Sequence, residues 1–95
     1  MVPVDLEVII PAYDEEVRIK RTLDRIREFY SDQTYTWRIT VVSDGSKDRT
    51  GAIVNEFAAQ DDRFRLLEYK PNRGKGHAVR YGIRRANAKR ILFCD

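Results

Sequence analysis

The sequence of 95 residues contains one cysteine and one histidine. A single cysteine excludes an internal disulfide framework and a zinc site built from several cysteines. Cys94 lies in an apolar run, which favours a small buried side chain over a reactive thiol. No apolar run approaches the roughly 18 residues that cross a bilayer, and residues 1–5 lack the segments of a secretory signal. We therefore expect a cytoplasmic protein.

Two common phosphate-binding motifs are also missing. A P-loop requires serine or threonine after its Gly-Lys pair, whereas Gly76 follows Lys75. A dinucleotide fingerprint follows the first strand, but the one candidate, at residues 74–76, comes after the third apolar run and has Val79 in place of its last glycine. These absences argue against an ATPase and a dehydrogenase.

The composition is that of a globular chain. Hydrophobic residues make up 42% and charged residues 35%, which argues against disorder. The net charge of +3 is unevenly distributed, because residues 70–90 carry eight lysines or arginines and no acid. Such a segment suits the phosphates of a nucleotide, an anionic membrane or a nucleic acid. The alternative for its helical arginines is a solvated helix face.

Apolar, β-branched runs alternate with segments of helical periodicity. We expect strands at residues 6–10, 37–43, 64–69 and 90–95. We expect helices from the 11–16 loop to about residue 30, at 48–60, and after a turn at 71–76. The side chains expected to face the sheet are Ile19, Leu23, Ile26 and Tyr30, then Ile53, Val54 and Phe57, then Val79, Ile83 and Ala86, with Gly82 allowing close packing.

This β-α-β-α-β-α-β order predicts the α/β class, with a parallel sheet between two layers of helices. The chain ends on an expected strand, where a doubly wound sheet seldom ends. We therefore interpret residues 1–95 as a single partial domain, truncated at its C-terminal end. The fourth strand would have an unpaired edge, through which a homodimer could form.

Polar residues gather where the strands end. The carboxyl ends of parallel strands share one edge of the sheet, so residues 13–15, 44–46, 72–76 and 95 should lie together there. Asp44 would stand at this edge with its carboxylate free to accept hydrogen bonds, and Gly45 would allow the sharp turn. Ser46 or Asp48 can cap the next helix. The alternative is a plain strand–turn–helix connection.

Five other residues admit simpler roles. Tyr13 could be a loop aromatic that packs on the sheet, and Glu15 and Glu16 could be acids that favour the start of a helix. We prefer that role for Glu16. His77 is expected to be an ordinary surface histidine, and Trp37 is expected to pack at the edge of the sheet.

Four segments together resemble a known family. The sequence is similar to the nucleotide-binding half of an inverting GT-A glycosyltransferase of family 2, which is Rossmann-like. Its lipid-phosphate enzymes, the dolichyl-phosphate glucosyl- and mannosyltransferases, are the most similar. The segments are residues 10–16 (IPAYDEE), 43–50 (SDGSKDRT), 72–82 (Asn-x-Gly-Lys-Gly-x-Ala-x-x-x-Gly) and 91–95 (Ile-x-Phe-x-Asp).

The resemblance implies binding of a UDP- or GDP-sugar at this edge of the sheet. Glu15 would accept a hydrogen bond from ribose, and Asp44 one from a ring N–H of the base. Lys75, with Arg73, would offset the charge of the diphosphate. Asp95 would be the first Asp of the family's Asp-x-Asp signature and would hold ribose and Mg²⁺ or Mn²⁺. The implied donor-binding residues are Pro11, Ala12, Tyr13, Glu15, Asp44, Gly45, Ser46, Arg73, Lys75 and Asp95, and Asp95 is the implied metal ligand.

The sequence departs from the family pattern at three points. Asp14 stands where Asn is usual, and Ser43 stands where a first Asp is common. The second Asp of the signature and the catalytic base would lie beyond residue 95, so no catalytic residue is assigned and the chain alone is expected to transfer no sugar. A polyprenyl or dolichyl phosphate acceptor would place the protein at the cytoplasmic face of a membrane.

A different class of function remains as an alternative. Residues 70–90 could form a non-catalytic basic module that binds an anionic membrane or nucleic acid. Binding of that kind weakens steeply with salt, whereas a base pocket selects among nucleotides. The chain has neither a helix-turn-helix pattern nor a sheet face of stacked aromatics, so we expect no nucleic acid.

Overall fold

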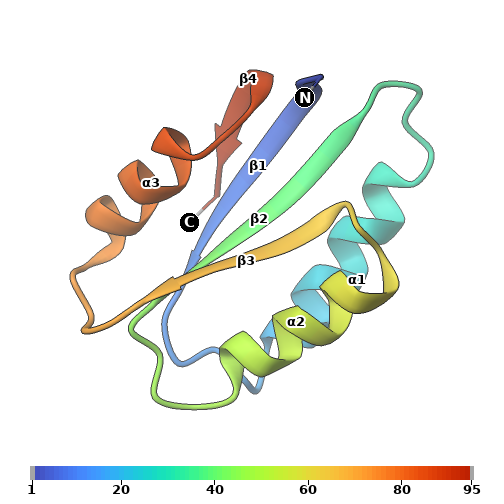
Figure 1. Ribbon diagram of the computed structural model, residues 1–95. Coiled ribbons are helices and arrows are strands. Elements are labelled where there is room, and N and C mark those ends of the chain that lie inside the picture. Colours follow the sequence, from blue (N-terminus) through green and yellow to red (C-terminus); the bar gives the residue numbers. More distant parts are fainter. Residues whose placement is uncertain (1, 95) are drawn as a thin grey trace.

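The computed structural model describes residues 2–94 and has one parallel sheet of four strands in the order β3-β2-β1-β4 (Figure 1). Strands and helices alternate along the chain, which confirms the predicted α/β class and element order. The strands are β1 (Val4–Ala12), β2 (Trp37–Asp44), β3 (Phe64–Tyr69) and β4 (Ala88–Phe93); the helices are α1 (Ile19–Tyr30), α2 (Thr50–Gln60) and α3 (Lys75–Arg84).

Helices cover both faces of the sheet. Helices α1 and α2 lie side by side on one face, and α3 lies on the other (Figure 1). The larger core, between the sheet and the α1–α2 layer, includes Val8, Leu23 and Phe57. The smaller core joins α3 to the sheet. A Cβ on Gly82 would lie 2.7 Å from Cγ2 of Ile9, so the predicted close packing at this glycine is confirmed.

The face of α3 that meets the sheet was predicted wrongly. The buried residues of α3 are Ala78 and Gly82, whereas Ile83 is 40% exposed. Ala86 lies beyond the end of the helix. The physical reason is the close approach of the helix, since small residues spaced by four bring its backbone against the sheet. The apolar periodicity that we followed is one position out of phase with this small-residue stripe.

Two further expectations were wrong. Helix α1 begins at Ile19, and its first turn contains no acid, so Glu15 and Glu16 do not act as first-turn acids. Trp37 is 4% exposed in the interior strand β2, and its ring lies between those of Tyr30 and Phe64. It is a core residue and does not lie at the edge of the sheet.

Strand β4 forms one edge of the four-stranded sheet. Its residues Ile91, Leu92 and Phe93 are 40%, 47% and 56% exposed. In the part of the chain described here, none of the three helices is long and apolar enough to span a bilayer.

Candidate functional site

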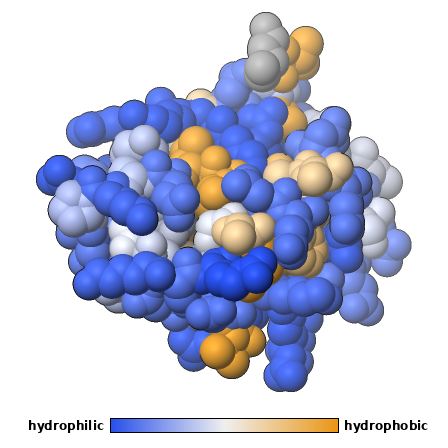
Figure 2. Space-filling view, turned by 60° about the horizontal axis from the view of Figure 1, so that its bottom comes forward, coloured by the Kyte–Doolittle hydropathy of each residue, from blue (hydrophilic) through white to orange (hydrophobic). Residues whose placement is uncertain are grey.

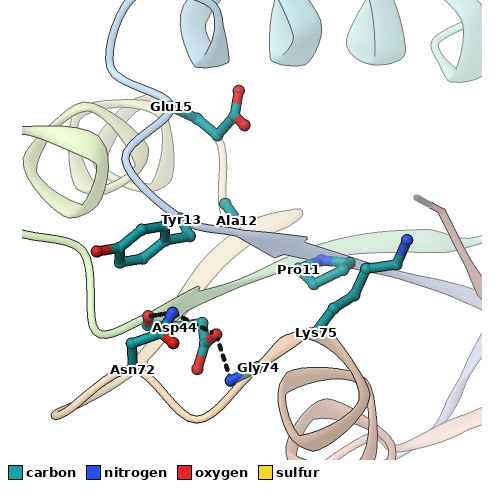
Figure 3. Close-up of a pocket in the computed structure, with 8 residues that line it drawn as sticks. All are labelled: Pro11, Ala12, Tyr13, Glu15, Asp44, Asn72, Gly74 and Lys75. Atoms are coloured by element: carbon teal, nitrogen blue, oxygen red, sulfur yellow. Dashed lines mark hydrogen bonds between the residues drawn. The ribbon is translucent and has the colours of Figure 1, made fainter.

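A pocket of about 300 Å³ opens where β1 and β2 end (Figure 3). Residues from three chain segments line it, as the shared edge of parallel strands predicts. The lining residues are Pro11, Ala12, Tyr13, Glu15, Asp44, Asn72, Gly74 and Lys75. Figure 2 turns this edge of the molecule toward the viewer and shows a mostly hydrophilic surface with small apolar areas.

The loop after β1 is held by side chains of the loop after β2. Asp14 has a φ of 48°, a left-handed conformation that Asp and Asn adopt more readily than most residues. Its backbone N–H donates to Oγ of Ser46 at 3.1 Å, and its Oδ1 accepts from the N–H of Lys47 at 2.8 Å. Ser46 therefore fixes the position of the loop that carries Tyr13. The Tyr13 side chain is 42% exposed.

Of the two predicted caps, Asp48 and not Ser46 bonds the start of α2, although the residue at the N-cap position is Arg49. Oδ1 of Asp48 accepts from the N–H of Thr50, the first residue of α2, at 2.9 Å. Oδ2 of Asp48 accepts from the N–H of Glu16 at 3.1 Å, and Oγ1 of Thr50 accepts from the N–H of Glu15 at 2.8 Å. The start of α2 thus anchors the loop after β1. The carboxylate of Glu15 accepts two hydrogen bonds from Arg18, at 3.0 and 2.9 Å.

Asp44 lies at the end of β2 and is 3% exposed. Its Oδ1 accepts from the Tyr69 hydroxyl at 2.5 Å and from the N–H of Arg73 at 2.8 Å. Its Oδ2 accepts from Nδ2 of Asn72 and from the N–H of Gly74, both at 2.9 Å. A carboxylate offers about four lone-pair positions, and these four donors fill them. The carboxylate therefore does not stand free at the edge as expected, and its contact with a ligand stays a prediction.

The loops after β2 and β3 touch at Gly45. Gly45 has a φ of 70°, and a Cβ there would lie 2.2 Å from the backbone nitrogen of Asn72. The predicted need for glycine in this turn is confirmed, because a side chain would be both strained and in collision. The contact places the segment after the cis peptide bond between Lys70 and Pro71 directly against the end of β2.

Three aromatic rings support the loop after β3. The ring centroid of Tyr69 lies 5.1 Å from that of His77 and 4.8 Å from that of Tyr81. Burial, the hydrogen bond to Asp44 and the charge of Asp44 raise the pKa of Tyr69 well above its usual value. His77 is half-buried in this cluster, so the expectation of an ordinary surface histidine is wrong.

The basic segment is divided between the pocket and the outer surface. Lys75, the first residue of α3, lines the pocket, and Arg73, two residues before it, is exposed. The guanidinium of Arg85 lies 3.5 Å from the centre of the Tyr81 ring and also donates to the carbonyl of Tyr81. Arg80 and Arg84 are exposed. The segment therefore includes structural contacts and is not uniformly a solvated face.

The predicted metal ligand, Asp95, lies outside the described residues. Among residues 2–94, no group of three or more His, Cys, Asp or Glu side chains is placed to hold a metal ion. The described residues therefore do not form a metal site by themselves.

Comparison with known proteins identifies the family. The sequence profile of Glycosyl transferase family 2 matches residues 7–95. The chain belongs to glycosyl transferase family 2. This family 2 chain is 40% identical over 92 residues to a dolichyl-phosphate beta-glucosyltransferase of Trichomonas vaginalis, covering 92% of the chain and 28% of the relative. It is 33% identical over 97 residues to the human dolichyl-phosphate beta-glucosyltransferase, covering 95% of the chain and 30% of the relative.

Solved structures agree with the fold of the family 2 chain. A mannosyltransferase from Pyrobaculum calidifontis, in complex with GDP-Man and Mn²⁺, has a TM-score of 0.72 at 31% identity and covers 90% of the chain and 27% of that structure. TarS from S. aureus, in complex with UDP-GlcNAc, has a TM-score of 0.81 over 96% of the chain and 26% of that structure. At 24% identity TarS supports the fold alone. The chain thus spans less than a third of the length of these relatives.

Sequence reasoning placed residues 72–76 at this edge but gave Asn72 and Gly74 no role, and it missed Tyr69. Asn72 and Gly74 belong to the third segment that carried the family resemblance, and this was the available signal. Tyr69 ends an expected strand opposite Asp44, with which it pairs in register. Parallel pairing of the second and third strands would have placed it there.

Proposed function

We propose that this chain is the donor-binding portion of a metal-dependent inverting glycosyltransferase. It would transfer a sugar from a UDP- or GDP-sugar to an acceptor such as polyprenyl or dolichyl phosphate. The observation that carries this proposal is the pocket at the ends of β1 and β2, lined by the segments of the family resemblance. Membership of family 2 and the names of the relatives support it.

The residues of the pocket suit the parts of a nucleotide sugar. Tyr13 offers an exposed ring for stacking on a base, and Glu15 offers a carboxylate for ribose hydroxyls. Lys75 and Arg73 supply positive charge for a diphosphate. The proposed donor site comprises Pro11, Ala12, Tyr13, Glu15, Asp44, Gly45, Ser46, Arg73, Lys75 and Asp95, of which Gly45 and Ser46 shape the loops.

A divalent cation, Mg²⁺ or Mn²⁺, is part of this proposal, with Asp95 as its ligand from this chain. The Mn²⁺ in the Pyrobaculum structure supports the choice. Such an ion would stabilise the departing nucleoside diphosphate. The chain's own contribution is to bind and orient the donor. No described residue is assigned to deprotonate the acceptor, so the 95-residue chain should transfer no sugar, and detectable turnover by the purified chain would contradict this.

The partners follow from the same proposal. A lipid phosphate acceptor would bring the protein to the cytoplasmic face of a membrane, and the names of the glucosyltransferase relatives support this acceptor. The exposed edge of β4 supports a homodimer, which light scattering over a range of concentrations would detect. The basic-module alternative through residues 70–90 explains neither the family match nor the pocket.

Calorimetric titration of UDP and GDP, with and without Mn²⁺, tests the proposal. Selective binding of one nucleotide that is lost in Asp44→Ala would support it. Asp24→Ala is the matched control, because Asp24 makes only surface ion pairs on α1. Equal and salt-sensitive binding of every polyphosphate would instead support the basic module.

A further inference from the structure

The outer side of α3 is an open helix surface. Among residues 2–94, α3 is the only helix on its face of the sheet (Figure 1). Its buried residues, Ala78 and Gly82, face the sheet. Arg80 lies midway between them in the sequence, so it points away from the sheet, because each residue turns the helix by about 100°. Ile83 and Arg84 also lie on this outer side and are exposed. We call Arg80, Ile83 and Arg84 the α3 surface.

The positive charge of the α3 surface is not neutralised. In the part of the chain that the structure describes, neither Arg80 nor Arg84 forms an ion pair. Residues 70–90 contain eight basic residues and no acid that could pair with them. A Cβ added to Gly76 would lie 3.4 Å from Nη1 of Arg80, so this guanidinium lies over the exposed start of the helix.

The opposite side of the sheet has a different balance of charge. Residues 15–30 and 47–62, which include α1 and α2, together carry eight acids and seven bases. On α1, Asp24 forms ion pairs with both Lys20 and Arg27, at 3.2 and 3.0 Å. The molecule is therefore electrically polarised across the sheet, with its positive side at α3. A field of this kind orients a protein on an anionic surface.

An anionic phospholipid bilayer fits the α3 surface better than a nucleic acid does. Lipid headgroups with net negative charge attract arginines, and Ile83, which is 40% exposed, can enter the interface between them. Binding of single-stranded nucleic acid relies on exposed aromatic rings. Beside α3, the rings of Tyr69 and Tyr81 pack on each other at 4.8 Å, and the guanidinium of Arg85 covers Tyr81.

We infer that the α3 surface docks the protein peripherally on an anionic phospholipid membrane. Because α3 packs on a face of the sheet, this docking sets the sheet parallel to the bilayer. The pocket at the edge of the sheet then opens along the membrane surface, where a soluble nucleotide can reach it. The inference goes beyond the proposed function, because the α3 surface acts through its charge and needs neither the acceptor nor the donor.

Co-sedimentation of the whole chain with lipid vesicles tests this inference. The chain should bind vesicles of equal parts phosphatidylcholine and phosphatidylserine, but not vesicles of phosphatidylcholine alone. Binding should be lost at about 1 M salt, where the screening length is about 3 Å. Replacing both Arg80→Gln and Arg84→Gln should weaken it about 25-fold, since each basic residue near an anionic surface contributes roughly fivefold.

The matched control replaces Arg21→Gln and Arg25→Gln, two exposed arginines that are also four residues apart but lie on α1. It removes the same net charge from the opposite side of the sheet and should leave vesicle binding nearly unchanged. Equal losses in the two double variants would show attraction by net charge alone and would overturn the inference. Equal binding to both kinds of vesicle, or to neither, would overturn it as well.

A duplex oligonucleotide provides the last arm of the test. If the chain bound it more tightly than the phosphatidylserine vesicles, and the α3 substitutions weakened that binding, the surface would belong to nucleic acid and the inference would be wrong. None of these outcomes decides the proposed function, because calorimetric titration with UDP and GDP tests the donor pocket separately.

Discussion

Two buried carboxylates in this chain accept the same number of hydrogen bonds but differ in whether any donor is charged. Glu7 on β1 is 0% exposed and Asp44 on β2 is 3% exposed. Glu7 accepts from Arg38 and Asn87 on one oxygen and from Thr40 and Arg65 on the other. Asp44 accepts four as well, but every one of its donors is neutral.

The difference lies in the counter-charge. Glu7 forms ion pairs with Arg38 at 3.2 Å and Arg65 at 3.0 Å, so its charge is offset within the sheet. The four hydrogen bonds to Asp44 all come from neutral groups, and this carboxylate lines a pocket that opens to solvent. Among residues 2–94 no ion pair of Asp44 is found; a hydrogen-bonded charge of this kind fits a ligand site, whereas a paired charge fits a structural one. The ion pairs of Glu7 thus distinguish it from Asp44, although the two carboxylates have similar burial and the same number of hydrogen bonds.

Removing Glu7 should have the largest effect on stability. In Glu7→Ala the guanidinium groups of Arg38 and Arg65 lose their partner, and we expect the free energy of unfolding to fall by about 3 kcal/mol. This value lies in the lower part of the range for broken buried ion pairs, because the two arginine side chains are 18% and 33% exposed. Urea denaturation measures it. Glu56→Ala, in an ion pair that is 65% exposed, should change little, and equal losses would contradict the comparison.

Breaking the contact between the two loops at Asp44 should rank second. Gly45→Ala combines a φ of 70° with a collision against Asn72, and we expect a loss of about 2 kcal/mol in urea denaturation. Gly74→Ala is the control, because Gly74 has a φ of 97° but nothing within 4 Å of the added Cβ. It should lose about 1 kcal/mol from backbone strain alone. A Gly45→Ala loss no greater than that of Gly74→Ala would show that the collision is relieved easily.

Removing one neutral donor from Asp44 should cost less and should depend on pH. Tyr69→Phe is expected to lower the free energy of unfolding by about 1 kcal/mol at neutral pH. The pKa of Tyr69 is raised in the folded state by burial and by Asp44, so the folded protein holds this proton more tightly than the unfolded chain does. The associated stability is present below about pH 10, where an unfolded tyrosine ionises, and is lost as pH rises above it.

Denaturation between pH 8 and 11 measures this effect. The wild type should lose stability over the alkaline part of the range, and Tyr69→Phe should lose less. Tyr35→Phe, which packs against the core of the opposite sheet face, should follow the wild type. Parallel alkaline losses in the wild type and Tyr69→Phe would show that this hydroxyl does not carry the dependence.

The smallest effect is expected at Ser43, the neighbour of Asp44. Its Oγ is buried without a hydrogen-bond partner among the described residues. Ser43→Ala removes an unsatisfied hydroxyl and should raise the free energy of unfolding by up to about 1 kcal/mol. Ser31→Ala removes a hydroxyl that donates to the carbonyl of Glu28 and should give no gain. Thermal unfolding of both variants makes the comparison, and a loss in Ser43→Ala would point to a partner for this hydroxyl.

The sequence predicts the place of Asp44 but not its environment. An acid at the end of a β-branched run, followed by glycine, is a local pattern, and parallel strands bring such ends together. Its four donors come from residues 69–74, and no local pattern encodes which oxygen each donor reaches. Glu7 was overlooked because it stands in an apolar run, and its partners are scattered from Arg38 to Asn87. The same limit explains α3, where close contact with Ile9 decides the buried face.

The strand order also has a consequence for how the chain is made. β1 precedes the other three strands of the sheet and lies in its interior, but one of its edges is covered only by β4. β1, β2 and β3 can pair before β4 has left the ribosome, so backbone groups of β1 stay open while the segment from Lys70 to Phe93 emerges. At roughly 5–20 residues per second this interval lasts on the order of seconds. The open edge of β1 is therefore available to another strand until β4 has emerged and paired with it.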